Sequence, residues 1–143
     1  AEKAMALGLD AVQLHGRVEE LDWAKFLPGV FVIRVFHMTP DEEKNAPTLH
    51  DALRPGYHHI ILLDTATQGG QDGGSGVSFN WSHVSNIPVP FLIAGGLTPD
   101  NVQEALTQSL AAGVDTSSGV ETEGQKDTAK ITAYVENARR VLS

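Results

Sequence analysis

Short apolar runs alternate with helix-forming stretches along the whole chain. Five runs are β-branched, aromatic or continuously apolar, which favours strands. We predict strands at residues 9–14, 30–36, 58–63, 90–94 and 113–116. Helices are predicted at residues 1–7, 18–27, 98–111 and from Asp127 to the C-terminus, with a shorter helix from Thr39, interrupted by Pro47, and a helical turn at residues 80–84. Thr98 is the expected N-cap of the third long helix.

The last helix has the clearest amphipathic pattern. Its apolar residues recur at i, i+3 and i+4 spacing, so they share one face. They are Ile131, Tyr134, Val135, Ala138, Val141 and Leu142. Because strands and helices alternate, we predict a single α/β domain over residues 1–143, with five parallel strands covered by helices. Strands that are apolar throughout are typical of a sheet that is buried on both faces.

Composition narrows the function classes. The chain has 143 residues, a formal charge of −8 and a pI of about 5.1, which argue against nucleic-acid or anionic-membrane binding driven by bulk charge. It has no cysteine, which excludes disulfides, thiolate metal sites and a cysteine nucleophile within this sequence. No apolar run approaches the roughly 18 residues of a membrane span, so we expect a soluble cytoplasmic protein. The chain opens on Ala1 inside a helical pattern, which indicates a segment missing upstream.

Candidate chemistry gathers at the carboxyl ends of the predicted strands, where parallel α/β folds carry their sites. Asp64 directly follows an apolar run. Partial burial there disfavours its charged form, and a carboxyl group that keeps its proton can act as a general acid. The alternative is an aspartate that accepts hydrogen bonds from amides of the following loop.

The glycine-rich stretch at residues 69–76 contains Gly73, Gly74 and Gly76. It is either a flexible surface loop or a mobile loop that folds over a substrate.

Two further turns predict a phosphate site. Gly95-Gly96 and Ser117-Ser118-Gly119 follow the last two strands, and the loops at this position of eight-stranded barrels commonly bind phosphate. Backbone amides and serine hydroxyls can hold a dianion without a net positive protein. The alternative is two tight turns that use glycine for a positive φ.

The histidines are less informative. His15 stands at the carboxyl end of a strand, where it is either a structural histidine or a substrate contact. No spacing of histidines and carboxylates indicates a metal site.

Several segments together resemble the phosphoribosylanthranilate isomerase family, nearly from end to end. They are residues 10–16 (DAVQLHG), 62–65 (LLDT), 73–76 (GGSG), 94–102 (AGGLTPDNV), 113–121 (GVDTSSGVE) and 124–127 (GQKD). The resemblance implies a (βα)₈ TIM barrel that catalyses the Amadori rearrangement of N-(5-phosphoribosyl)anthranilate to 1-(2-carboxyphenylamino)-1-deoxyribulose 5-phosphate in tryptophan biosynthesis. It implies that Asp64 is the general acid and that the loops at residues 73–76, 95–96 and 117–119 enclose the phosphorylated substrate. It implies no metal or organic cofactor.

The resemblance also implies truncation. The five strands correspond to the fourth to eighth of the family's barrel, and the cysteine that serves as general base after its first strand has no counterpart here. We therefore expect this chain alone to be inactive. Relatives fused to indole-glycerol-phosphate synthase exist, so the resemblance leaves open whether the parent polypeptide is a fusion. Two alternatives are another phosphate-binding barrel, such as a ribulose-phosphate epimerase, and a non-catalytic, flavodoxin-like phosphate-binding module. In the latter, the strand order would reverse midway.

Overall fold

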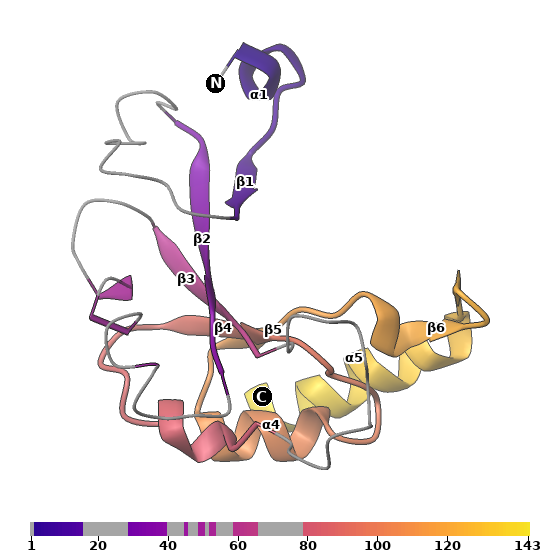
Figure 1. Ribbon diagram of the computed structural model, residues 1–143. Coiled ribbons are helices and arrows are strands. Elements are labelled where there is room, and N and C mark those ends of the chain that lie inside the picture. The colour runs from indigo at the N-terminus through magenta and orange to yellow at the C-terminus, as the bar shows by residue number, and fades with distance from the viewer. Residues whose placement is uncertain are drawn as a thin grey trace.

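The five predicted strands are all present and form one parallel sheet (Figure 1). The strands are β1 (Ala11–Leu14), β2 (Phe31–His37), β3 (Ile60–Asp64), β4 (Phe91–Ala94) and β5 (Gly113–Val114). The helices are α1 (Glu2–Ala6), α4 (Val102–Ser109) and α5 (Thr128–Leu142), with 3-10 turns η1 (Trp81–Val84) and η2 (Ser118–Val120). The computed structural model describes residues 2–15, 29–39, 45, 49–50, 52–53, 59–65 and 79–143. The predicted helix at residues 18–27 and most of the helix after Thr39 lie outside these residues.

The strands neighbour one another in the order β1-β2-β3-β4-β5, which is also their order along the chain. Every neighbouring pair is parallel. A doubly wound sheet reverses its order midway, so the flavodoxin-like alternative is wrong. A sequential parallel order is the arrangement found in (βα)₈ barrels, and it brings all five carboxyl ends to one edge of the sheet.

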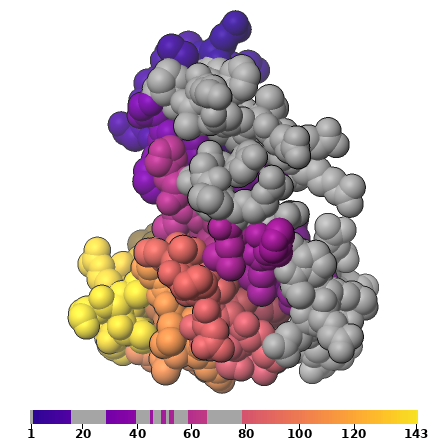
Figure 2. Space-filling model, turned by 90° about the vertical axis from the view of Figure 1, so that its left-hand side faces the viewer, coloured from indigo at the N-terminus to yellow at the C-terminus, as the bar shows by residue number. Residues whose placement is uncertain are grey.

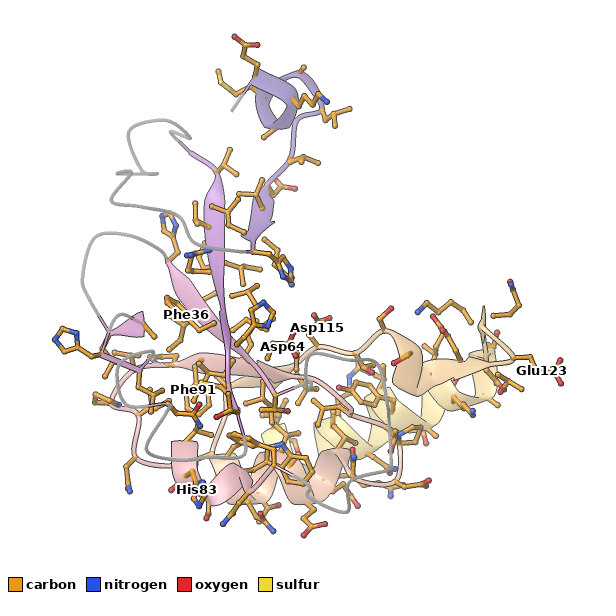
Figure 3. The ribbon with its side chains drawn as sticks, in the orientation of Figure 1. Phe36, Asp64, His83, Phe91, Asp115 and Glu123 are labelled. Carbon is orange, nitrogen blue, oxygen red and sulfur yellow. The ribbon has the colours of Figure 1, made fainter. Side chains whose placement is uncertain are left out.

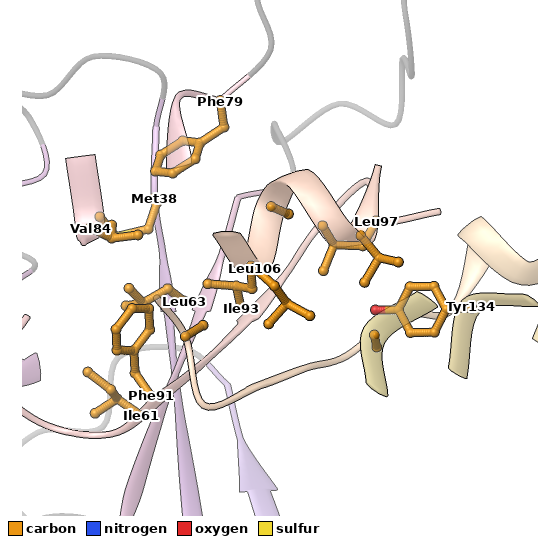
Figure 4. Close-up of a cluster of buried hydrophobic side chains, with 14 of the residues drawn as sticks. Met38, Ile61, Leu63, Phe79, Val84, Phe91, Ile93, Leu97, Leu106 and Tyr134 are labelled. Carbon is orange, nitrogen blue, oxygen red and sulfur yellow. The ribbon is translucent and has the colours of Figure 1, made fainter. Parts of the chain in front are cut away.

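The two faces of the sheet carry separate apolar clusters, because successive side chains of a strand point to opposite sides. One face packs against α4 and α5, and its cluster is the main core (Figure 4). Ile61, Leu63 and Ile93 contribute from the strands, and each is at most 1% exposed. We call the opposite side the inner face. Its cluster consists of Val35, Leu62 and Ala94, packed with Ile33 and Leu92.

The amphipathic face of α5 is only partly covered. Tyr134 and Ala138 are buried, as the pattern predicts, whereas the other four apolar positions are 37–46% exposed: Ile131, Val135, Val141 and Leu142. Figures 1 and 2 show that α1 and α5 lie at opposite ends of the molecule, so neither helix covers the other. The apolar spacing identified the face correctly, but it did not show how much of that face this chain covers.

The strand bounds differ from the sequence prediction by one or two residues, and α4 and the hairpin after β5 differ more. α4 begins at Val102 rather than at Thr98, because residues 98–101 form a turn in which the Asn101 side chain accepts a hydrogen bond from the Thr98 amide at 2.8 Å. It ends at Ser109, since Leu110 adopts a left-handed conformation with φ of 59°. The hairpin of β6 (Glu121–Thr122) and β7 (Gln125–Lys126) was not predicted.

None of the helices in the described part of the chain combines the length and apolar character that a membrane crossing needs.

Candidate active site

Polar side chains form a row along the carboxyl edge of the inner face. His37 and Asp64 are paired residues in the register between β2 and β3. Their side chains point to the same face of the sheet as those of Val35 and Leu62, which belong to the inner cluster. His15 directly follows β1 and Asp115 follows β5, each at the same edge. The alternation that fills the middle of the inner face with apolar side chains therefore ends in two imidazoles and two carboxylates.

The closest contact in this row is between His37 and Asp64. Nδ1 of His37 lies 3.4 Å from Oδ2 of Asp64, and the two side chains are 42% and 20% exposed. On the other side of His37, the His15 ring stands with its centroid 6.2 Å away, tilted by 42°. Nε2 of His15 is in turn 3.1 Å from the Gln13 amide nitrogen. Both histidines are exposed, whereas Asp64 is half-buried, so the carboxyl group is the most sheltered of the three.

A buried threonine joins the end of β3 to the loop after β4. The amide of Thr65 donates to the carbonyl of Ala94 at 2.9 Å. Its hydroxyl donates to the same carbonyl at 2.9 Å and lies 3.2 Å from the carbonyl of Gly95. Because Thr65 is the next residue after Asp64, these bonds fix the backbone of the carboxyl group relative to the first predicted phosphate turn.

The turn after β4 is held open by its glycines and by one asparagine. Gly95 and Gly96 have φ values of 93° and 62°, a region that residues with a side chain rarely adopt. Asn101 donates from Nδ2 to the Gly96 carbonyl at 2.9 Å. The turn is thereby tied to the residue that immediately precedes α4, so the backbone of residues 95–101 forms one hydrogen-bonded unit.

The turn after β5 packs directly against the turn after β4. Thr116 donates from its hydroxyl to the Leu97 carbonyl at 2.7 Å. A Cβ on Gly119 would stand 1.8 Å from the same carbonyl oxygen, so only glycine fits there. Lys126 on β7 donates to the carbonyl of Ser117 at 2.8 Å. The two turns predicted to bind phosphate are therefore in contact.

The structure brings most of the predicted site residues to one edge. Asp64, His15 and the turns containing Gly95, Gly96, Ser117, Ser118 and Gly119 all follow carboxyl ends of the strands. The predicted loop residues Gly73, Gly74 and Gly76 lie outside the described residues. Within the described ranges, no group of three or more histidines and carboxylates is arranged to hold a metal ion.

Several residues that organise the edge were given no function from the sequence, although His37 was placed with His15 and Asp64 at the carboxyl end of a predicted strand. They are His37, Thr65, Asn101, Thr116 and Lys126. Only His37 had a usable signal: it ends an apolar run as Asp64 does, and it has the same parity as Ile33 and Val35. The other four lie in segments that carry the family resemblance and donate to backbone carbonyls. Asn101 does so within its own turn, whereas Thr65, Thr116 and Lys126 bond a neighbouring loop, which follows from tertiary structure and not from a local pattern.

The chain is similar to known proteins over almost its whole length. The family model described as N-(5'phosphoribosyl)anthranilate (PRA) isomerase matches residues 1–137. An N-(5'-phosphoribosyl)anthranilate isomerase of Eremothecium gossypii is 41% identical over 143 residues, covering 94% of this chain and 64% of that protein. A multifunctional tryptophan biosynthesis protein of Schizosaccharomyces pombe is 44% identical over 129 residues, covering 90% of this chain and 15% of that protein.

Solved structures agree with these relatives. The phosphoribosyl anthranilate isomerase of Thermotoga maritima superposes with a TM-score of 0.74 at 34% identity, covering 97% of this chain and 66% of that one. A phosphoribosyl anthranilate isomerase in complex with reduced 1-(o-carboxyphenylamino)-1-deoxyribulose 5-phosphate has a TM-score of 0.71 at 30% identity, covering 97% and 64%. The chain thus spans less than two thirds of the length of the curated relatives named above. By its sequence and its fold, the chain belongs to the N-(5'-phosphoribosyl)anthranilate isomerase family.

Proposed function

We propose that this chain carries the acid and the phosphate-binding loops of an enzyme that isomerises N-(5'-phosphoribosyl)anthranilate to the corresponding 1-(carboxyphenylamino)-1-deoxyribulose 5-phosphate. The observation that carries the proposal is the link from Asp64 through Thr65 to the carbonyls of Ala94 and Gly95. It connects a sheltered carboxyl group to a glycine turn at the same edge of the sheet. A relative bound to the reduced product analogue supports the same ligand class.

In the proposed reaction, neutral Asp64 donates its proton to the furanose ring oxygen. The bond between that oxygen and C1 breaks, and the anthranilate nitrogen supplies the electron pair that forms the C1–N double bond. A base then removes the proton from C2, which gives an enolamine that tautomerises to the amino ketone. Proton transfer by a positioned carboxyl group is typically worth about 10²–10⁴ in rate. Asp64 ends the step as a carboxylate and must regain a proton before the next turnover.

The phosphate group is assigned to the two turns in contact with each other. Amides of Gly95, Gly96 and Gly119 and the hydroxyls of Ser117 and Ser118 offer donors in a protein whose net charge is −8. Backbone amides that point at the phosphate group compensate locally for the negative net charge of the protein, which repels anions. We assign His15, together with Gly73, Gly74 and Gly76, to the remaining contacts with the substrate.

We further propose that three more strand–helix units complete the barrel in the active protein and supply its base. β1 pairs with β2 alone and β5 with β4 alone among the described strands, which leaves two open edges. The half-exposed apolar face of α5 supports the same conclusion, since it offers a surface for neighbouring elements. The sequence contains no cysteine that could act as a thiolate base. A multifunctional relative supports a fused parent polypeptide, and a biosynthetic enzyme of this class fits a cytoplasmic location.

The test is Asp64→Asn in the full polypeptide that carries this chain, with Asp10→Asn as the matched control at the opposite edge of the sheet. We expect the first variant to lose roughly 10²–10⁴-fold in kcat while it still binds the reduced product analogue, and the control to behave as the parent. Unchanged turnover in Asp64→Asn would remove the acid assignment. Purified chain 1–143 is expected to show no turnover alone and to gain it when the amino-terminal units are added. Turnover by the chain alone would overturn the proposal that further units supply the base.

A further inference from the structure

His37 is in contact with Asp64 and can carry a proton, and the reaction outlined above gives it no task. Its Nδ1 lies 3.4 Å from Asp64 Oδ2, a distance that a small rotation of either side chain turns into a hydrogen bond. Register pairs the two residues across β2 and β3, so the contact follows from the strand alignment and not from a loose loop. Figure 3 labels Asp64, which ends β3. Its ring is about twice as exposed as the carboxyl group: 42% against 20%.

The acid role of Asp64 requires a route by which its carboxylate regains a proton, and the contact with His37 offers one. After each turnover Asp64 is a carboxylate. Its protonation by hydronium alone is slow at pH 7, because the hydronium concentration is low. A diffusional limit of roughly 10⁹–10¹⁰ M⁻¹s⁻¹ delivers about 10²–10³ protons per second at that concentration. Enzyme turnover numbers extend over the same range, and shelter from solvent slows the encounter further. An imidazole that faces the carboxylate with one ring nitrogen and is itself partly exposed to solvent provides a second route for the proton.

We propose that His37 is a positioning residue that holds the Asp64 carboxyl group and returns a proton to it after each turnover; the proposal rests on the acid role of Asp64. The imidazolium passes its Nδ1 proton to Oδ2 of the Asp64 carboxylate, which becomes the neutral acid. The imidazole that remains takes a proton from water or buffer at its exposed ring. The base releases to solvent the proton that it took from C2, and the proton that Asp64 gave to the sugar oxygen is replaced from solvent, so the isomerisation has no net proton change.

The surroundings of His37 are compatible with this task. On the β1 side it faces the His15 ring at 6.2 Å, and on the β3 side it faces Asp64. Asp115 stands at the same edge beyond β4, two strand spacings or about 10 Å from Asp64 along the sheet. On its own strand, Arg34 has the opposite parity and donates to the Leu14 carbonyl at 3.1 Å, so its charge is directed to the other face.

The deciding experiment compares His37→Asn with the parent in the full polypeptide. An asparagine at this position places an amide donor near the site of Nδ1, so it retains the contact with Asp64 without a titratable group. We expect His37→Asn to lower kcat roughly tenfold to a hundredfold with KM unchanged, and kcat to rise with buffer concentration. Added imidazole restores most of the loss. His50→Asn, an exposed histidine outside the edge row, serves as the control and behaves as the parent.

The outcomes separate this inference from the proposed function. If Asp64→Asn abolishes turnover while His37→Asn retains full, buffer-independent activity, the acid role stands and the relay is wrong. If Asp64→Asn is active, the proposed function fails first. A kcat loss in His37→Asn that imidazole and buffer do not affect means that His37 is only structural, which also overturns the relay. Nitrogen-15 spectra give a readout without catalysis: Asp64→Asn should change the His37 Nδ1 resonance and leave that of His50 in place.

Discussion

The ammonium group of Lys126 donates to both the carbonyl oxygen and Oγ of Ser117, at 2.8 and 3.1 Å. Its third close neighbour is Glu121, whose Oε1 lies 2.6 Å away. The hairpin of β6 and β7 thus returns a cation to the turn that follows β5. A short element with no apolar pattern of its own therefore brings a positive charge to the proposed phosphate site.

Replacing Lys126 by Met should weaken binding of the substrate's phosphate group. The variant loses the charge and frees the Ser117 turn, and a charge-assisted hydrogen bond contributes about 1.5–3 kcal/mol. Because Lys126 is half exposed, we expect the lower end of that range, roughly a tenfold rise in KM with kcat little changed. Steady-state kinetics on the full polypeptide measure both constants.

Lys130→Met is the matched control for this variant. Lys130 donates to the carbonyl of Glu121 at 2.6 Å, so its loss removes the same charge from the same region without touching Ser117. Equal KM values for the two variants would show that the positive charge of this region, and not the contact with Ser117, affects phosphate binding.

The two glycine turns should differ in their response to alanine. At Gly119 a Cβ meets the Leu97 carbonyl oxygen at 1.8 Å, so the backbone of one turn must move. We expect Gly119→Ala to lower the free energy of unfolding by about 3 kcal/mol. At Gly96 nothing lies within 4 Å of the added atom, and only the positive φ of 62° opposes it, which costs about 1–2 kcal/mol. Urea unfolding of both variants checks the order; a reversed order would contradict the packing of the two turns.

The sequence predicted the strands and the N-terminus of α5 because both have local causes. Apolar runs bounded by turn residues mark β2, β3 and β4, and the Asp127 side chain accepts hydrogen bonds from the amides of Ala129 and Lys130, as an N-cap does. The β6–β7 hairpin was missed since its four paired residues carry no alternating apolar pattern. Its turn depends on Glu123, which adopts a φ of 53°, and on Gly124.

The candidate site likewise has a part that one segment of the sequence predicts and a part that depends on contacts between distant segments. Asp64 was identified because it ends an apolar run, a feature visible in one segment. Its pairing with His37 depends on the register between two strands about 27 residues apart, and the contact of Gly119 with Leu97 depends on how two loops pack. Relations between distant segments of this kind are fixed by tertiary structure, and no periodicity along the chain contains them.

Asp127 should stabilise α5 in a pH-dependent way. The pKa of its carboxyl group is lowered first by the hydrogen bond from the Thr122 hydroxyl and then by those from the amides of Lys130 and Ala129. A lowered folded-state pKa means that the stabilisation is present above the ordinary value of about 3.8 and is lost as the pH falls through the lower folded value.

We therefore expect Asp127→Asn, which keeps a capping acceptor, to melt a few degrees below the parent at pH 7 and to match it at the acid end of the stability curve. Thermal unfolding followed by circular dichroism measures the difference. A gap between the two proteins that stays constant from pH 7 to pH 2 would contradict the assigned cause.

Tyr134 should give the complementary effect in alkali. It is 6% exposed, and its hydroxyl makes no hydrogen bond to any residue in the described part of the chain. Burial and, to a smaller extent, the charge of Asp115 raise the pKa of Tyr134 far above its ordinary value of 10.0. The unfolded state can then lose this proton while the folded state keeps it, so stability falls as the pH rises above about 10.

The sequence contains two tyrosines, Tyr57 and Tyr134, so a spectrophotometric titration can distinguish them. The tyrosinate absorbance assigned to Tyr134 by comparison with Tyr134→Phe should stay absent until the protein unfolds. At pH 7 that variant should be as stable as the parent or up to about 1 kcal/mol more stable, because it removes a buried hydroxyl without a partner. A variant that unfolds more easily at pH 7 would show that the hydroxyl forms a stabilising bond, and ionisation of Tyr134 near pH 10 in the folded protein would contradict its burial.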